Sequence, residues 1–125
     1  MKQLVKDLTN DYLDLQLKHF HHLHAHPELS FEEYETSTYI KEQLTALGIT
    51  LQEGIHGTSV AGILDSGVPG PVIAFRADID ALPVQEETDL EYKSVTPGVM
   101  HACGHDSHTA TLLALPHCWQ SIGNW

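Results

Sequence analysis

The spacing of apolar residues predicts two helices in the first part of the chain. Over residues 4–26, apolar side chains recur every three or four positions among charged ones, as on one face of a helix. This helix is expected to end before Pro27, because the residue preceding a proline avoids the α region. A capping-box pattern at residues 30–33 predicts that a second helix begins at Ser30, and Gly48 is predicted to end it.

The period of the pattern changes to two residues after Gly48. Short strands are predicted at residues 49–51 and 59–64, and the glycine-rich residues 66–70 are predicted to form the turn that follows. Residues 72–75 (Val-Ile-Ala-Phe) are apolar without alternation, which is typical of a strand buried on both faces at the centre of a sheet. Helices followed by such strands predict an α/β fold.

The last part of the chain is predicted to contain a loop, a short helix and an irregular tail. Residues 85–99 are polar and show no period, so they are interpreted as a loop. A helix over residues 109–115, capped by Asp106 or Ser107, is expected to end at Pro116, because proline interrupts helical hydrogen bonding. The tail after it has no regular pattern, and we expect its large apolar side chains to be exposed: Trp119, Ile122 and Trp125.

Composition narrows the class of protein. Six basic residues against 17 acidic ones give a formal charge of −11, which argues against nucleic acid or an anionic membrane as a partner. An apolar fraction of 42% supports a real core. The two cysteines, Cys103 and Cys118, are too few for a disulfide framework. Because the first ten residues lack the apolar core of a signal peptide and no apolar run approaches a membrane span, we expect a cytoplasmic protein.

The densest group of reactive side chains lies in residues 100–108, Met-His-Ala-Cys-Gly-His-Asp-Ser-His. Thiolate, imidazole and carboxylate are ligand types that bind zinc. Gly104 allows the backbone to turn between Cys103 and His105, since it has no Cβ to clash. The spacing fits either a metal site or a cysteine nucleophile activated by a neighbouring histidine, and both interpretations stay open.

Two other groups of side chains are candidates for a site. Asp78 and Asp80 follow the predicted buried strand, at the edge where ligands bind in open α/β sheets. The alternative is that both carboxylates cap the strand and pair with Arg76. Five histidines lie between residues 19 and 26, some of them one helical turn apart, so one helix face offers chelating groups. The alternative there is a polar helix end, where histidine suits the negative pole of the helix dipole.

Four motifs in order closely resemble one enzyme family. They are residues 23–31 (Leu-His-Ala-His-Pro-Glu-Leu-Ser-Phe), 57–62 (Gly-Thr-Ser-Val-Ala-Gly), 76–83 (Arg-Ala-Asp-Ile-Asp-Ala-Leu-Pro) and 100–106 (Met-His-Ala-Cys-Gly-His-Asp). The family is that of the metal-dependent amidohydrolases, which include N-acyl-amino-acid amidohydrolases, hippurate hydrolases and auxin-conjugate hydrolases, relatives of the aminoacylases and zinc carboxypeptidases. The similarity extends over roughly residues 13–115.

The resemblance implies a fold, a reaction and a set of site residues. The fold would be the N-terminal part of a zinc-peptidase-like three-layer α/β/α catalytic domain. The reaction would be hydrolysis of the amide bond of an N-acyl amino acid, a small-molecule substrate, by two divalent metal ions, zinc or manganese. By position in the motifs, Cys103 and His105 would be metal ligands and Asp80 would orient a ligand, while the role of Asp78 stays open. The metal pair would lower the pKa of a bound water and polarise the carbonyl.

The chain also departs from this family. It stops before the glutamate pair, the further histidine ligands and the inserted dimerisation domain of family members, and its pattern diverges from Pro116 onward. We therefore expect a truncated or frame-shifted product, with a partial catalytic domain at residues 1–115, a divergent tail at residues 116–125 and no activity alone. The alternatives are a metal-binding module without turnover and a cysteine hydrolase that uses Cys103. An unpaired sheet edge would also favour a homo-oligomer.

Overall fold

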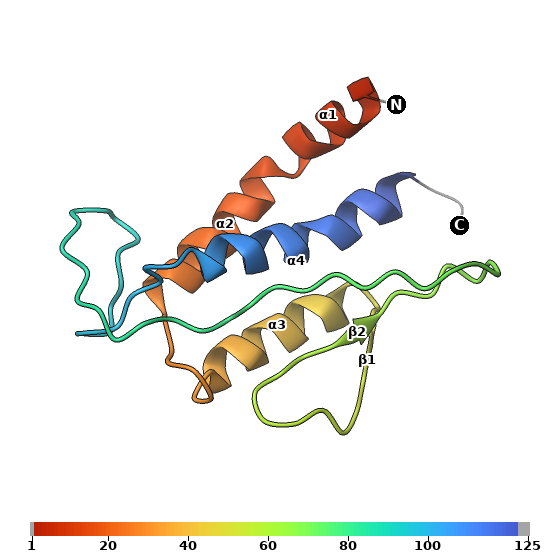
Figure 1. Cartoon of the computed structure of the whole chain (residues 1–125). Coiled ribbons are helices and arrows are strands. Elements are labelled where there is room, and N and C mark those ends of the chain that lie inside the picture. The colour runs from red at the N-terminus through yellow and green to blue at the C-terminus, as the bar shows by residue number, and fades with distance from the viewer. Residues whose placement is uncertain (1, 123–125) are drawn as a thin grey trace.

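The computed structural model describes residues 2–122, except for the side chains of residues 2, 5 and 122. Within this range the chain forms four helices and a two-stranded sheet (Figure 1). This combination confirms the α/β class that the pattern predicts. The elements are α1 (Lys2–Asp11), α2 (Leu13–Ala25), α3 (Tyr34–Ala46), β1 (Thr50–Leu51), β2 (Gly62–Ile63) and α4 (His105–Ile122).

The first predicted helix is divided into α1 and α2 at Tyr12. The backbone of Tyr12 (φ −107°, ψ 6°) departs from helical geometry. Its N–H still donates 3.2 Å to Leu8 O and its carbonyl accepts the Gln16 N–H at 2.9 Å, so the division is a bend in a nearly continuous path. α2 ends at Ala25, two residues before Pro27, which confirms the predicted end of the helix.

Helix α3 begins at Tyr34, four residues later than predicted. The capping box at Ser30 is wrong because Phe31 has a left-handed backbone (φ 69°), which no helix continues through. The Glu28 carboxylate instead accepts two backbone N–H groups of the first helical turn, at 3.1 and 2.8 Å. The other end agrees with the prediction, since Gly48 follows the helix with φ 71°.

Strands β1 and β2 form an antiparallel hairpin that is shorter than the predicted strands at residues 49–51 and 59–64. At Gly62 in β2, the backbone passes close to the Ile49 side chain, which directly precedes β1. A Cβ built there would lie 2.7 Å from Cγ2 of Ile49, so the close approach requires glycine. The register places Thr50 opposite Ile63 and Leu51 opposite Gly62.

Residues 72–75 are extended but belong to no strand within the described part of the chain, so the prediction of a buried central strand is wrong here. Val72 is 98% exposed and Ile73 is 72% exposed. A strand requires neighbours that pair with its N–H and C=O groups, and residues 2–122 pair no strand with this segment. One side contacts α4, where the Phe75 ring lies edge-to-face against Trp119 at 5.2 Å.

Helix α4 continues through Pro116 to Ile122, so the prediction that proline ends the helix is wrong. Proline removes one backbone donor, but tertiary contacts hold the turns that follow it. Gln120 Nε2 donates 3.0 Å to the carbonyl of Leu47, and Trp119 packs on Phe75 instead of lying fully exposed. The expected exposure of two other tail side chains lies outside the described residues: Ile122 and Trp125.

The core lies where α2, α3 and α4 meet. Helix α2 packs along α4, while α3 contacts both α4 and β1. No helix within residues 2–122 is long and apolar enough to cross a membrane. The buried apolar residues are Leu23, Ile40, Ile49, Ala81, Ala110, Leu113 and Ala114.

Candidate functional site

A backbone bridge joins the two segments that carry the predicted site residues. Leu82 and Met100 exchange two backbone hydrogen bonds, each of 3.0 Å. The chain just after Asp80 therefore lies beside the start of residues 101–106. The intervening residues 85–99 contain no helix or strand, which confirms the predicted loop.

His105 is oriented by Asp80. The Nδ1 atom of His105 lies 2.9 Å from Asp80 Oδ1 and 3.0 Å from the Asp80 carbonyl oxygen. Because both oxygens are acceptors, Nδ1 carries the proton and the lone pair of the neutral ring is on Nε2. The second carboxylate oxygen of Asp80 accepts the Ser30 hydroxyl at 3.0 Å. Burial acts to raise the pKa of Asp80, but the hydrogen bonds from Ser30 and His105 outweigh it and lower the pKa.

Cys103 is exposed and lies two residues before His105 at the predicted loop-to-helix junction. Gly104 between them has φ 85°, a left-handed conformation that favours glycine. The helix begins at His105, earlier than Asp106 and Ser107, so the predicted cap by either of these residues is wrong. The reason is that the Gly104 carbonyl already accepts a backbone N–H from four residues later, at 3.4 Å.

The donor set at this junction suits a divalent metal such as zinc, since it combines an exposed thiol with an imidazole whose Nε2 is free of the Asp80 contact. Within residues 2–122, no group of three or more histidine, cysteine, aspartate or glutamate side chains is arranged to hold a metal ion. The described chain therefore offers two candidate ligands and one orienting carboxylate.

The side chain of Asp78 pairs locally. Its Oδ1 forms an ion pair with Arg76 Nη2, which is the alternative stated for this residue above. The Asp78 carbonyl accepts the Thr109 hydroxyl at 2.9 Å, so Asp78 anchors the extended segment to α4 through its backbone. Within residues 2–122, the Asp78 carboxylate forms no hydrogen bond or ion pair with Cys103 or His105.

The histidines of residues 19–26 use their rings in local contacts. His19 Nδ1 lies 2.7 Å from the Tyr39 hydroxyl, and the His22 ring stacks on Tyr39 at 4.0 Å. His26 Nδ1 donates 2.8 Å to the His22 carbonyl. The two contacts with Tyr39 tie α2 to α3 and favour a structural role for His19 and His22.

His24 is the functional candidate that sequence reasoning missed. It is buried, with Nδ1 2.6 Å from Asp106 Oδ2 and Nε2 3.2 Å from Glu86 Oε1. The sequence did contain one indication that His24 is buried, because His24 lies one helical turn after Phe20 on the apolar face of the helix. In the structure the two rings lie 5.5 Å apart. A polar residue on an apolar face requires buried partners, and both partners are distant in the sequence.

His101 is a second buried histidine beside the candidate ligands. Neither of its ring nitrogens has a hydrogen-bond partner among the described atoms. Burial is the largest influence on its pKa and lowers it, so the ring is neutral at neutral pH. An unpaired buried ring of this kind is rare in folded chains and marks this segment as unusual.

A hollow of about 430 Å³ lies between α4 and the extended segment. Its lining includes neither Cys103 nor His105, so it does not extend the candidate metal site. The lining residues are Phe75, Arg76, His108, Thr111, Leu112 and Leu115.

Known proteins match this sequence over most of its length. The model of peptidase family M20/M25/M40 matches residues 74–122. Thermostable carboxypeptidase 1 of Saccharolobus solfataricus is 47% identical over 114 residues, which are 88% of this chain and 29% of that protein. The N-acyl-L-amino acid amidohydrolase of Geobacillus stearothermophilus is 48% identical over 113 residues, which are 90% of this chain and 30% of that protein.

A solved structure matches the fold. It is the Bacillus subtilis YXEP protein, a dinuclear metal binding peptidase from the M20 family, with a TM-score of 0.76 and 39% identity over 92% of this chain and 32% of that chain. The chain thus spans about a third of the length of the relatives that it matches. The family match extends past Pro116, while the predicted boundary between residues 1–115 and 116–125 stays a prediction. Motif order, sequence identity and fold agree, and over most of its length the chain is similar to members of peptidase family M20/M25/M40.

Proposed function

We propose that this chain forms part of the site of a metal-dependent hydrolase that cleaves the amide bond of N-acyl amino acids. Cys103 and His105 are the proposed ligands, and Asp80 is the proposed orienting residue. The observation that carries the proposal is the 2.9 Å hydrogen bond between His105 Nδ1 and Asp80 Oδ1. A carboxylate that holds the far nitrogen of a histidine is the usual arrangement around a metal-binding imidazole. The N-acyl-L-amino acid amidohydrolase among the relatives supports the substrate class.

Each residue has a distinct task in this proposal. Cys103 Sγ and His105 Nε2 would hold the metal, while Asp80 keeps the proton on His105 Nδ1 and Ser30 holds Asp80 in turn. A pair of divalent ions, zinc or manganese, would supply a bound water of lowered pKa and polarise the substrate carbonyl. The partner would be a small-molecule substrate, and the protein would work in the cytoplasm.

Cobalt binding tests the ligand assignment. Addition of Co²⁺ to the whole chain should produce a thiolate absorption band with micromolar affinity at best, because two protein ligands are fewer than the three or four of natural zinc sites. Cys103→Ala should abolish the band. Cys118→Ala is the matched control and should keep it, since burial raises the pKa of the Cys118 thiol within α4. A Cys103→Ala variant with the wild-type band would refute the assignment.

A second candidate function is a metal-binding module without turnover. It is favoured by the two-ligand set within residues 2–122. Hydrolysis of an N-acyl amino acid by the chain itself separates this candidate from the hydrolase. The stoichiometry of bound metal separates both from a cysteine nucleophile at position 103.

A further inference from the structure

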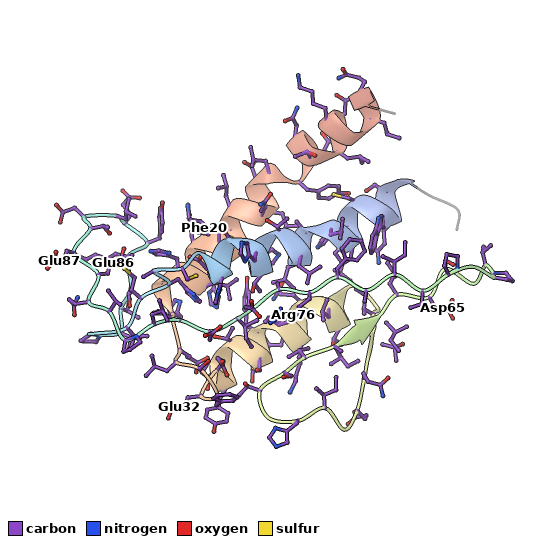
Figure 2. The ribbon with its side chains drawn as sticks, in the orientation of Figure 1. Phe20, Glu32, Asp65, Arg76, Glu86 and Glu87 are labelled. Carbon is purple, nitrogen blue, oxygen red and sulfur yellow. The ribbon has the colours of Figure 1, made fainter. Side chains whose placement is uncertain are left out.

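His24 joins three parts of the chain at one buried point. It comes from the last turn of α2, and its two ring nitrogens contact Asp106 in α4 at 2.6 Å and Glu86 in the 85–99 loop at 3.2 Å. All three side chains are buried. Figure 2 shows Glu86 on the inner side of the loop, toward α2, and Glu87 on the outer side.

The hydrogen bonds of the two carboxylates determine the charge of the ring. Glu86 Oε2 accepts the Ser94 N–H at 2.6 Å, and its Oε1 accepts the Thr88 hydroxyl. Asp106 Oδ1 accepts the N–H of the next residue at 2.8 Å. One oxygen of each carboxylate lies within hydrogen-bond distance of a ring nitrogen of His24 and accepts from it, so each nitrogen donates its own proton. A ring with two N–H donors is an imidazolium with a charge of +1.

The surroundings of His24 are consistent with this charge. Burial acts to lower the pKa of His24, but the hydrogen bonds and negative charges of Asp106 and Glu86 outweigh it and raise the pKa. Burial acts in the opposite direction on Glu86, where the bonds from Ser94, Thr88 and His24 lower the pKa of the carboxyl.

We infer that His24 is a buried imidazolium that positions residues 101–106 by bridging Glu86 and Asp106. Asp106 directly follows His105, so the bridge holds the backbone from which a proposed ligand projects. Glu86 holds the loop that leads into the same segment. Within residues 2–122, His24 forms no hydrogen bond or ion pair with Cys103 or His105, so it is a positioning residue. The inference rests on the proposed function, because the ligands that it positions are those proposed above.

Nitrogen NMR of the wild-type chain tests the charge without any substitution. We expect His24 at neutral pH to show both ring nitrogens protonated, with slowly exchanging N–H signals coupled to Asp106 and Glu86. A neutral His24 ring with one bare nitrogen would overturn the inference. This measurement stands even where a His24 variant fails to fold.

Paired substitutions test whether the charge performs the positioning. His24→Gln leaves two buried carboxylates without their cation, and we expect cobalt affinity to fall about tenfold, as for other outer residues of metal sites. His21→Gln is the control. His21 belongs to the same helix as His24, but its ring stacks on Tyr92 and contacts neither carboxylate of the bridge. Glu86→Gln should lower the urea midpoint in the wild type but raise it in the His24→Gln background, because it removes the unbalanced charge. A packing role gives no such reversal of sign, and its absence would refute the inference.

Hydrogen exchange separates this inference from the proposed function. Loss of the bridge should speed exchange of the Met100 amide, which pairs with Leu82, in His24→Gln and not in His21→Gln. The wild-type chain could bind no cobalt and still have a charged His24 ring, while Met100 exchange is faster in His24→Gln alone. This result would contradict the metal assignment and support the bridge. Unchanged exchange in His24→Gln would overturn the bridge whatever the metal does.

Discussion

At the scale of single residues, the charge of the contacting groups determines which buried histidines carry charge. His24 is buried between two carboxylates, and its pKa is raised. His19 is equally buried but contacts the neutral Tyr39 hydroxyl. Burial, followed by the positive charges of His117, Lys18 and His22, lowers the pKa of His19 to about 4. The pKa values of two histidines on one helix are therefore shifted in opposite directions, because their partners differ in charge.

His19 should make the fold less stable in mild acid. Between pH 6.5 and about 4, the unfolded chain binds a proton at this site that the folded chain does not. The free energy of unfolding therefore falls as pH falls through this window, by at most about 3 kcal/mol from this group. Urea unfolding near pH 7 and near pH 5 should show a smaller loss for His19→Gln than for wild type. His56→Gln, which replaces an exposed loop histidine, should keep the wild-type loss, and an equal loss in all three chains would contradict the prediction.

At the scale of elements, residues 72–75 differ most from their sequence pattern. The run has the composition of a central strand but lies extended and largely in solvent on one side. Its unpaired backbone groups are a template for pairing with another chain. The formal charge of −11 opposes such association, so the expected product is a soluble oligomer instead of a precipitate.

Self-association should depend on this extended segment. In sedimentation at micromolar concentration, we expect the wild-type chain to form species larger than the monomer. Ile73→Lys should return the chain to the monomer, because a charge at an exposed strand position opposes edge pairing. Val68→Lys makes the same change in charge at another exposed apolar position and should still associate. A compact wild-type monomer at every concentration would show that the segment is not a pairing edge.

At the scale of the whole molecule, the described chain brings together the two proposed ligands and the residue proposed to orient one of them. His105 is held by Asp80, and Cys103 is exposed beside it, but residues 2–122 contain no group of three metal-binding side chains. The fold matches about a third of a dinuclear metal binding peptidase. Positioned general bases contribute roughly 10²–10⁴-fold to the rate of such reactions, and the second metal adds its own contribution.

The isolated chain should therefore bind metal without hydrolysing N-acyl amino acids at an enzymatic rate. With hippurate as substrate, the metal-loaded chain is expected to be no faster than the metal-loaded Cys103→Ala variant. Turnover that a chelator and Cys103→Ala both abolish would contradict this prediction. It would mean that a second copy of the chain, or groups such as His24, His26 or His117, complete the site.

Local backbone chemistry was enough to determine several features from the sequence. Pro27 and Gly48 end their helices, because each acts on its own backbone or that of its immediate neighbours. The loop at residues 85–99 was predictable from its polar, aperiodic composition. The order of motifs indicated the family. The motif positions predicted that Asp80 orients a metal ligand; Asp80 contacts His105, and the roles of both residues stay predictions.

Contacts between distant parts of the chain decided the rest. Residues 72–75 have strand composition, but a strand also needs hydrogen-bonding neighbours that a local pattern does not supply. Pro116 is compatible with a helix here because α4 is held by packing beyond it, which compensates for one lost donor. The partners of His24 lie 62 and 82 residues away, so its charge follows from the fold and from no nearby residue. Propensity acts over a few residues, whereas pairing, burial and charge depend on which distant groups the tertiary structure places in contact.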